Sequence, residues 1–309
     1  MFEITYVKRV VLVGTISNAS SNLRSDLSKV IKAMSTFDLI QIFLVESDST
    51  DSTISILEEL RTEIEVFDFI SLGELAKQMP ERINRIRHCR NVYVKEIRNL
   101  LKERDLDYVV VADLDGMNSR ISAKAFESSF TRDDWGAVLA NQFGGYYDLL
   151  ALRHPTWCPK DMLADLRDQK SKIDKFPLPM LSVVRRAKRR YAYDTARKNA
   201  IYSKMRRINR REDWIEVSSG FGGLGIYKSE IFSKFDYSLL EIEMNFESEH
   251  VALSKKITDS GQKIFINPRM INNYFNTYNV NRFLIIRQFR EIYWNSSSKL
   301  KKLRLNDSA

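Results

Sequence analysis

Apolar residues in the first third of the chain occur in short runs separated by longer amphipathic stretches. The runs "RVVLVGT" (9–15), "DLIQIFLVE" (38–46), "EVFDFISL" (65–72) and "DYVVVADLD" (107–115) are rich in β-branched and aromatic residues and predict four strands. Helical spacing follows the first run, with apolar side chains at Leu23, Leu27, Ile31 and Met34. Strands that alternate with helices predict an α/β fold with a mostly parallel, doubly wound sheet.

The run at 107–115 is continuous in apolar residues, which is typical of a central strand that is covered on both faces. It ends in Asp113 and Asp115, whose side chains point the same way if the segment is extended. Two such carboxylates can hold Mg²⁺ or Mn²⁺ together with substrate phosphates. A strand-end turn that leads into a helix is the alternative interpretation of the same residues.

The pattern changes in the second half of the chain. "DDWGAVLANQFGGYYDLLALRHPTW" (133–157) predicts two short strands around a Gly-Gly turn, and "IEVSSGFGGLGIYKSEIF" (215–232) predicts further strands and tight turns. "ESEHVALSKKITDSGQKIFINPRM" (247–270) predicts a helix, a glycine turn and a last strand. No Gly/Ser-rich linker divides the sequence, so we expect one α/β domain over residues 1–280 and a C-terminal basic helical extension over 281–309.

Positive charge is unevenly placed in this chain of 309 residues, whose formal net charge is +9. Residues 185–211 are dense in Arg and Lys within a predicted helical insertion at about 160–212, and the tail "KLKKLRL" adds a second cluster. Such clusters suit nucleic acid, anionic lipid or a phosphorylated substrate, or form solvated helical faces. No zinc-finger, RNP-type or KH-type pattern accompanies them, so nucleic acid is not the expected partner.

The patterns of apolar runs and cysteines indicate the cellular compartment in which the protein works. No run approaches the ~18 apolar residues of a membrane-spanning helix, and "MFEITYVKRVVLVGT" lacks the plan of a signal peptide and predicts a first buried strand. We therefore expect a cytoplasmic protein whose basic clusters allow peripheral association with the inner face of the plasma membrane. Cys89 and Cys158 lie far apart without CxxC spacing, which favours small buried residues over a disulfide or a structural zinc site.

Polar loops follow three of the predicted strands, where open α/β sheets bind ligands. "GTISNAS" begins with Gly14, which allows close approach of the backbone to a ligand, and Thr15. "ESDSTDST" offers Glu46 and Asp48 as acceptors for a base or for ribose hydroxyls. The third loop carries the two aspartates.

Several motifs in fixed order resemble nucleotide-sugar-dependent glycosyltransferases of the GT-A fold. The resemblance is to bacterial capsule and lipopolysaccharide enzymes and to the fungal capsule-associated mannosyltransferases related to them. It covers most of residues 10–268 and rests on the stretches "VESDSTDST", "ERINRIRHCRN", "YVVVADLDG", "WGAVLANQ", "YYDLLALRHPTW", "SSGFGGLGIYK" and "ESEHVALSKKI" followed by "GQKIFINP".

The resemblance implies a donor site for a UDP- or GDP-sugar with Mn²⁺ or Mg²⁺. Asp113 and Asp115 would hold the ion, and His250 would be a third ligand or a diphosphate contact, with a helix-face histidine as the alternative. The implied donor-binding residues are those of the strand-end loops, a helix start at "HCRN" and the backbone under the sugar: Thr15, Glu46, Asp48, Arg90, Asn91, Asp113, Gly222 and Gly223.

The implied residues near the sugar and the acceptor are Tyr147, Asp148 and Arg153 in "YYDLLALR". An inverting enzyme needs a carboxylate base, for which Asp148 and Glu249 are the candidates, whereas a retaining enzyme needs none. The sequence leaves this open, although the fungal relatives transfer with retention. Because Glu249 and His250 are adjacent, both reach one site only if a helix begins there.

The function implied is hexose transfer to a lipid-linked or polysaccharide acceptor in capsule or O-antigen assembly. A nucleotidyltransferase predicts a Gly-rich basic loop after the first strand, but "GTISNASSNLR" has one glycine and one arginine. "GFGGLG" lacks the strand-to-helix context of a dinucleotide fingerprint. A basic module that binds nucleic acid or membrane without catalysis is the remaining alternative.

Overall fold

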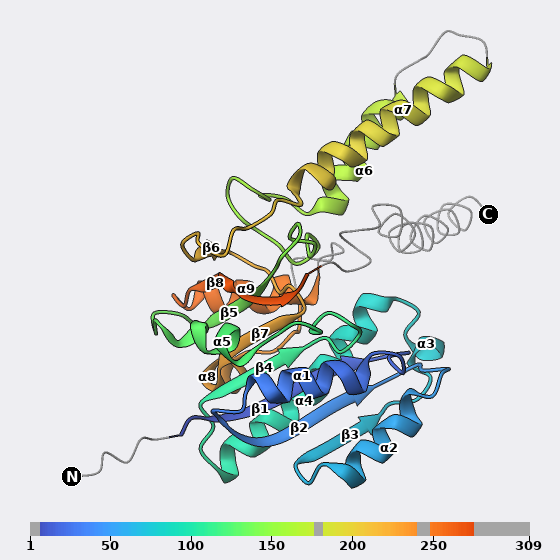
Figure 1. Cartoon of the computed structure of the whole chain (residues 1–309). Coiled ribbons are helices and arrows are strands. Elements are labelled where there is room, and N and C mark those ends of the chain that lie inside the picture. Colours follow the sequence, from blue (N-terminus) through green and yellow to red (C-terminus); the bar gives the residue numbers. More distant parts are fainter. Residues whose placement is uncertain (1–6, 176–181, 240–247, 275–309) are drawn as a thin grey trace.

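The computed structural model describes residues 7–175, 182–239 and 248–274, which form a sheet with helices on both faces (Figure 1). The sheet has eight strands in the order β3-β2-β1-β4-β7-β5-β8-β6. Their bounds are β1 (Arg9–Ile16), β2 (Asp38–Glu46), β3 (Phe67–Ser71), β4 (Tyr108–Ala112), β5 (Ala137–Gln142), β6 (Ile215–Val217), β7 (Leu224–Lys228) and β8 (Ile264–Asn273). The first four strands run parallel to one another, which confirms the doubly wound pattern predicted for the first third of the chain.

The helices of the described residues connect these strands or extend from them. They are α1 (Leu23–Ala33), α2 (Thr53–Glu63), α3 (Leu75–Gln78), α4 (Arg82–Glu103), α5 (Ala123–Glu127), α6 (Met162–Lys175), α7 (Ser182–Ala200), α8 (Ser229–Lys234) and α9 (Glu249–Asp259). None of the helices in this part of the chain combines the length and the apolar composition that crossing a bilayer requires.

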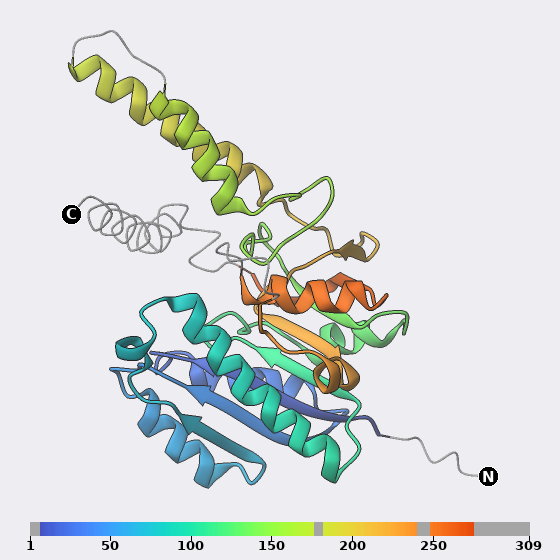
Figure 2. The same cartoon turned by 180° about the vertical axis from the view of Figure 1, so that it is seen from behind.

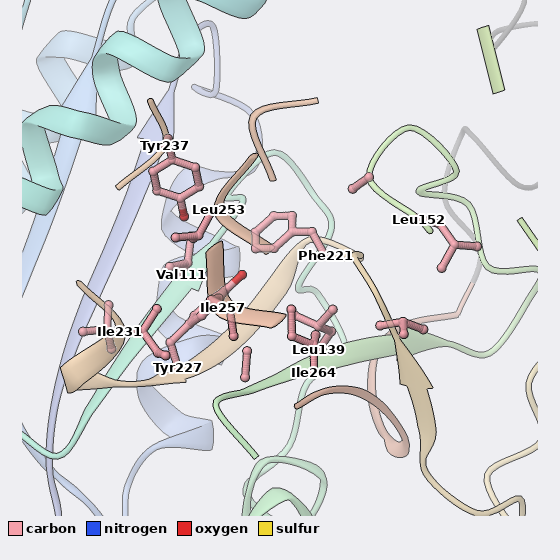
Figure 3. Close-up of a cluster of buried hydrophobic side chains, with 14 of the residues drawn as sticks. Val111, Leu139, Leu152, Phe221, Tyr227, Ile231, Tyr237, Leu253, Ile257 and Ile264 are labelled. Carbon is pink, nitrogen blue, oxygen red and sulfur yellow. The ribbon is translucent and has the colours of Figure 1, made fainter. Parts of the chain in front are cut away.

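Side chains alternate across the central strands and build one core on each face of the sheet. On β4, Val110 and Ala112 join the core under α1 and α2, whereas Val109 and Val111 join the core under α4 and α9. α1 and α4 accordingly lie on opposite faces in the two views (Figures 1 and 2). Figure 3 shows part of the second core, where Val111 lies near Phe221, Tyr237 and Leu253. The continuous apolar run thus marks a central strand, as predicted.

The segment after β5 differs from the prediction of a second strand beyond the Gly-Gly turn. Gly145 forms an isolated bridge with Arg207, and the chain then turns through residues 147–152. A Cβ added at Gly145 would lie 2.6 Å from the Met205 carbonyl oxygen, so this glycine allows a close backbone contact. Pairing with the end of the insertion takes the place of a regular strand.

The basic insertion is helical, as predicted, and consists of α6 and α7 packed side by side in an arm that projects from the sheet (Figures 1 and 2). The predicted extension at 281–309 lies outside the described residues. Cys89 and Cys158 are both buried free thiols, as expected from their spacing.

Candidate active site

The candidate site lies at the edge where parallel strands β1, β2 and β4 end. Asp113 directly follows β4 and continues the alternation of Val109 and Val111, whose side chains face α4 and α9. The carboxylate therefore points toward side chains from those two helices. Asp115 is more exposed, beyond the end of the strand.

Arg90 on α4 joins two carboxylates that lie far apart in the sequence. Its Nε donates to Glu249 Oε1 at 3.0 Å, and one of its terminal nitrogens lies 3.6 Å from Asp113 Oδ1. The Arg90 side chain is only 4% exposed, and its other terminal nitrogen donates to the Tyr93 hydroxyl. Arg90 is thus a buried counter-ion that fixes the positions of both acids.

The expectation that "HCRN" marks a helix start is wrong, because α4 begins at Arg82 and Arg90 lies in its interior. Asn91 accepts from the Tyr237 backbone N–H at 2.9 Å and donates to the Ser238 hydroxyl. These contacts tie α4 to the segment after α8. Binding of a donor by Arg90 or Asn91 stays a prediction, and in the structure each holds other parts of the protein.

The pKa of Asp113 is raised to about 8. Burial is the largest cause, and the attraction of Arg90 opposes it. Three neighbouring carboxylates add to the increase: Asp115, Asp148 and Glu249. One buried guanidinium therefore does not neutralise the negative charge gathered at this end of the sheet.

The loop that carries the two aspartates is held from below by Asp26 on α1. Asp26 is 1% exposed, and its Oδ2 accepts from the backbone N–H groups of Gly116 at 2.8 Å and Asn118 at 3.2 Å. Asp26 was not among the site residues predicted from the sequence. The signal was present, because Asp26 lies among Leu23, Leu27 and Val30 on the buried face of α1, where a carboxylate needs a partner.

Buried amides join this loop to the glycines predicted to lie beneath the sugar. Asn118 donates to the carbonyl oxygens of Asp113 and Gly223, and Asn272 donates to Asn118 and to the Gly222 carbonyl. Gly222 and Gly223 have φ values of 74° and 83°, a region that favours glycine. Their conformation is therefore fixed by the same network that holds the loop.

Both glycines also make close approaches that a side chain would block. A Cβ at Gly222 would lie 2.7 Å from the Ala140 carbonyl oxygen, and one at Gly223 would lie 3.0 Å from the Tyr147 hydroxyl. These close approaches are made to other parts of the protein. Contact with a sugar stays a prediction.

Asp148 lies against the same turn. Its Oδ2 accepts from the Gly222 backbone N–H at 3.0 Å, and its Oδ1 accepts from the Ala151 N–H at 3.3 Å. Burial raises the pKa of Asp148, although these two N–H groups oppose the effect. Tyr147 is half-buried next to it. Arg153, by contrast, donates to two carbonyl oxygens and pairs with Asp161 at 3.0 Å, so it anchors the loop to the start of the arm.

Glu249 and His250 begin α9, where the Ser248 hydroxyl caps the helix by accepting from the His250 N–H. The condition for both to reach one site, a helix that begins there, is met. Burial alone would raise the pKa of Glu249, but attraction to Arg90 lowers it below its usual range.

The His250 ring is 4% exposed and stacks on Phe221, with ring centroids 3.9 Å apart. Neither ring nitrogen has a hydrogen-bond partner. Burial, together with repulsion from Arg90, lowers the pKa of His250 to about 3, so the imidazole is neutral near pH 7. Its metal or diphosphate role stays a prediction.

The loops after β1 and β2 are organised by their own side chains. Glu46 is fully buried, accepts from the Ser49 N–H at 2.9 Å and bonds to the Ser71 hydroxyl. Asp48, at a φ of 60°, accepts from the Ala76 N–H at 2.7 Å and pairs with Arg85. These two residues shape the loop that was predicted to recognise the nucleoside, and direct contact with a donor is untested.

Thr15 lies at the end of β1, half-buried and in register with Val45 of β2. Gly14 beside it was expected to let the backbone approach a ligand. A Cβ at Gly14 would lie 2.5 Å from the Ala112 carbonyl oxygen, so the close approach seen in the structure is to β4.

The fit of the candidate site to a divalent ion depends on the number and charge of its possible ligands. The described residues contain no group of three His, Cys, Asp or Glu side chains arranged to hold a metal ion. Asp113 and Asp115 nevertheless form a carboxylate pair at the strand end, and burial, with a smaller contribution from neighbouring carboxylates, raises the pKa of Asp113. Mg²⁺ is commonly held by one or two carboxylates that are completed by substrate phosphates, so the pair fits an ion that arrives with a diphosphate.

Comparison with known proteins identifies no match to a family model and none to a curated protein sequence. Solved structures do match. A mannosyltransferase from Pyrobaculum calidifontis in complex with GDP-Man and Mn²⁺ is 13% identical, with a TM-score of 0.47, over 87% of this chain and 57% of that chain. S. aureus TarS in complex with UDP-GlcNAc is 14% identical, with a TM-score of 0.42, over 84% of this chain and 56% of that chain.

GalNAc-T7 with UDP, GalNAc and Mn²⁺ is 12% identical, with a TM-score of 0.50, over 87% of this chain and 43% of that chain. The chain thus spans less than two thirds of each of these structures. At such low identity the likeness concerns the fold. The protein has the mixed α/β fold of the GT-A type, an eight-stranded sheet flanked by helices, as the sequence predicted.

Proposed function

We propose that this protein is a divalent-metal-dependent glycosyltransferase that moves a hexose from a UDP- or GDP-sugar to a glycan acceptor. The observation that carries the proposal is the carboxylate pair Asp113 and Asp115 at the end of the central strand of a GT-A-type sheet. Asp113 lies 3.6 Å from the buried Arg90, and three further carboxylates near it add to its raised pKa. GalNAc-T7, which shares the fold, has been crystallised with UDP and Mn²⁺.

Different residues of the chain would bind the metal ion and the sugar of the donor. Asp113 and Asp115 would hold Mn²⁺ or Mg²⁺, and the ion when bound would neutralise charge on the departing nucleoside diphosphate. Asp26 and Arg90 keep the two carboxylates in place from opposite faces of the sheet. The backbone at Gly222 and Gly223 would lie beneath the sugar, close to Tyr147.

The two candidate bases differ in proton affinity. Glu249 has a lowered pKa because it pairs with Arg90, and an ionised, paired carboxylate is a weak base. Asp148 has a raised pKa, which suits a group that accepts a proton near neutral pH. If transfer proceeds with inversion, we therefore assign the base to Asp148; with retention no base is needed.

The acceptor is proposed to be a polysaccharide or a lipid-linked glycan in capsule or O-antigen assembly, with the protein acting at the cytoplasmic face of the plasma membrane. This part of the proposal rests on the order of sequence motifs quoted above. Arg153 would act by anchoring the acceptor-side loop, given its pairing with Asp161.

The test is transfer or donor hydrolysis with Mn²⁺ across UDP- and GDP-sugars, repeated with Asp113→Asn, Asp115→Asn and the matched exposed control Asp133→Asn. Each site variant should lose activity on the order of 100-fold or more, as when a group that stabilises developing charge is removed. Asp133→Asn should keep full activity, and EDTA should abolish the activity of the wild type. Full activity in both site variants, or in EDTA, would refute the metal role. The anomeric configuration of the product, read by NMR, decides between retention and inversion.

A further inference from the structure

The excess positive charge of the chain lies mainly in the insertion, and the C-terminal tail carries a second, smaller cluster. Residues 160–212 contain 17 Lys and Arg and six Asp and Glu, whereas the remaining residues contain 32 Lys and Arg and 34 Asp and Glu. The rest of the protein is therefore nearly neutral. An insertion in which 17 basic residues face six acidic ones points to an anionic partner.

This charge is presented on the projecting arm of α6 and α7 (Figures 1 and 2). α7 has 19 residues, which at ~1.5 Å per residue corresponds to roughly 28 Å. Among the described side chains of the arm, the buried ones are Met162, Leu166, Ala196 and Ala200. All four lie near the end of the arm that joins the sheet domain, so the outer part contributes little to the core.

Three of the four acidic side chains on α6 and α7 lie next to basic neighbours, and the fourth, Asp168, is exposed. Asp165 pairs with Lys204 at 2.7 Å, and Asp194 pairs with Arg197 at 3.3 Å. Asp174 lies 3.8 Å from Arg189. Five exposed basic side chains have no ion pair within the described part of the chain: Lys172, Lys175, Lys188, Arg190 and Lys198. We call these the arm bases.

An aromatic ring lies among the arm bases. Tyr191, directly after Arg190, is 75% exposed and is the most exposed large hydrophobic side chain of the described residues. Tyrosine is enriched at the boundary between lipid and water, where its ring and its hydroxyl find different surroundings. Basic side chains combined with an exposed aromatic ring are typical of helices that lie on anionic membranes.

We propose that the arm docks onto an anionic phospholipid surface through the arm bases, with Tyr191 inserted among the headgroups. The arm bases are distributed along two helices, which suits a plane of phosphates better than a single bound anion. The inference rests on the proposed function and names the surface through which the protein would contact the membrane. It does not involve Asp113 or Asp115, so vesicle binding and sugar transfer can fail separately.

The test measures binding of the full chain to vesicles of phosphatidylcholine with and without phosphatidylglycerol, at low and high salt. The arm variant carries Gln at all five arm bases. The matched control removes the same number of charges from exposed lysines of the sheet domain: Lys29, Lys32, Lys95, Lys102 and Lys124. Circular dichroism and melting temperature confirm that both variants fold.

Wild type and control should bind the anionic vesicles, and high salt should weaken that binding. The arm variant should bind about 100-fold or more weakly, given the contribution of each basic residue near a charged membrane. Equal binding by arm variant and control, or equal binding to neutral vesicles, would overturn the proposal.

A second measurement separates lipid from a soluble polyanion. In Tyr191→Trp, the added emission should shift to the blue with anionic vesicles and not with polyphosphate, because only lipid gives the ring an apolar environment. Tighter binding to polyphosphate or to an RNA oligonucleotide than to vesicles, with no blue shift, would show that the partner is a soluble polyanion and would refute membrane docking.

Discussion

Arg90 and Arg190 carry the same type of side chain, but Arg90 is buried and Arg190 is exposed. Arg90 is 4% exposed and lies against Asp113 and Glu249, whereas Arg190 is exposed on α7 and has no ion pair among the described residues. Around Arg90 negative charge is in excess, and around Arg190 positive charge is in excess. The first region is a fixed internal arrangement; the second is a surface that is open to a partner.

Burial sets the strength of a charge and the distance over which it acts. In the interior a charge interacts strongly with a few fixed partners, and removing one partner leaves the other exposed to the full cost of desolvation. On the arm, water and salt screen each charge, so effects are small, additive and sensitive to ionic strength. Four predictions use this contrast.

The largest effect is expected for Arg90→Met. Loss of the guanidinium leaves Glu249 and Asp113 buried without their counter-ion, which should lower the free energy of unfolding by ~3–5 kcal/mol. Arg190→Met, the matched control on the arm, should change it by less than ~0.5 kcal/mol. Denaturant titration measures both. Adding Glu249→Gln to Arg90→Met should recover part of the loss; equal costs for the two arginines would contradict the role of burial.

Asp26→Ala should have the next largest effect. The substitution leaves the Gly116 and Asn118 N–H groups without their acceptor, at a cost of ~2–3 kcal/mol in unfolding free energy. Because the loop also carries Asp113 and Asp115, Mn²⁺ binding measured by calorimetry should weaken as well. Asp38→Ala, at a carboxylate that is 53% exposed, is the control and should change neither quantity. Unchanged Mn²⁺ affinity in Asp26→Ala would separate this residue from the site.

The pH dependence of stability should report the neutral, buried His250. Its pKa falls from 6.5 in the unfolded chain to about 3 in the folded protein. Between these values the unfolded chain binds more protons, so the contribution of His250 is fully present above pH 6.5 and is lost as pH falls. The slope is ~1.4 kcal/mol per pH unit. Wild type should lose stability more steeply than His250→Phe over this window in denaturant titrations; parallel profiles would show that the imidazole is solvated.

The smallest effect concerns single substitutions on the arm. Lys172→Gln or Lys188→Gln should change the free energy of unfolding by no more than ~0.5 kcal/mol, because each lysine is exposed and has no ion pair among the described residues. Thermal unfolding at low salt measures this. A large loss from either lysine would mean that the arm is held by its basic side chains and is not simply a surface.

Local sequence patterns were enough to predict much of the fold. The continuous apolar run at 107–115 indicated a central strand, because a strand that is covered on both faces has apolar side chains on both. The helix that begins at Glu249 was also predictable, since Ser248 is a good N-cap residue. The segment after Gly144 was misjudged, because its backbone pairs with residues near 206 that no local pattern brings there.

The candidate site was predictable only in part. Asp113 and Asp115 were found because their chemistry is visible in one short stretch. Asp26 and Asn272 were missed because their roles depend on partners about 90 and 150 residues away. Arg90 was identified, but its burial between two acids was not, because the sequence does not show which helix faces the end of β4.

Local sequence patterns were sufficient to predict the alternation of strands and helices, the aspartate pair at a strand end and the concentration of basic residues in one insertion. These features depend on neighbours within a few residues, which the chain order fixes. The packing of the whole fold was needed to see that α4 and α9 meet over the end of β4, where one arginine faces two acids. It also decided that the basic insertion projects as an arm. Both outcomes depend on which distant surfaces pack together, because burial is a property of the whole fold.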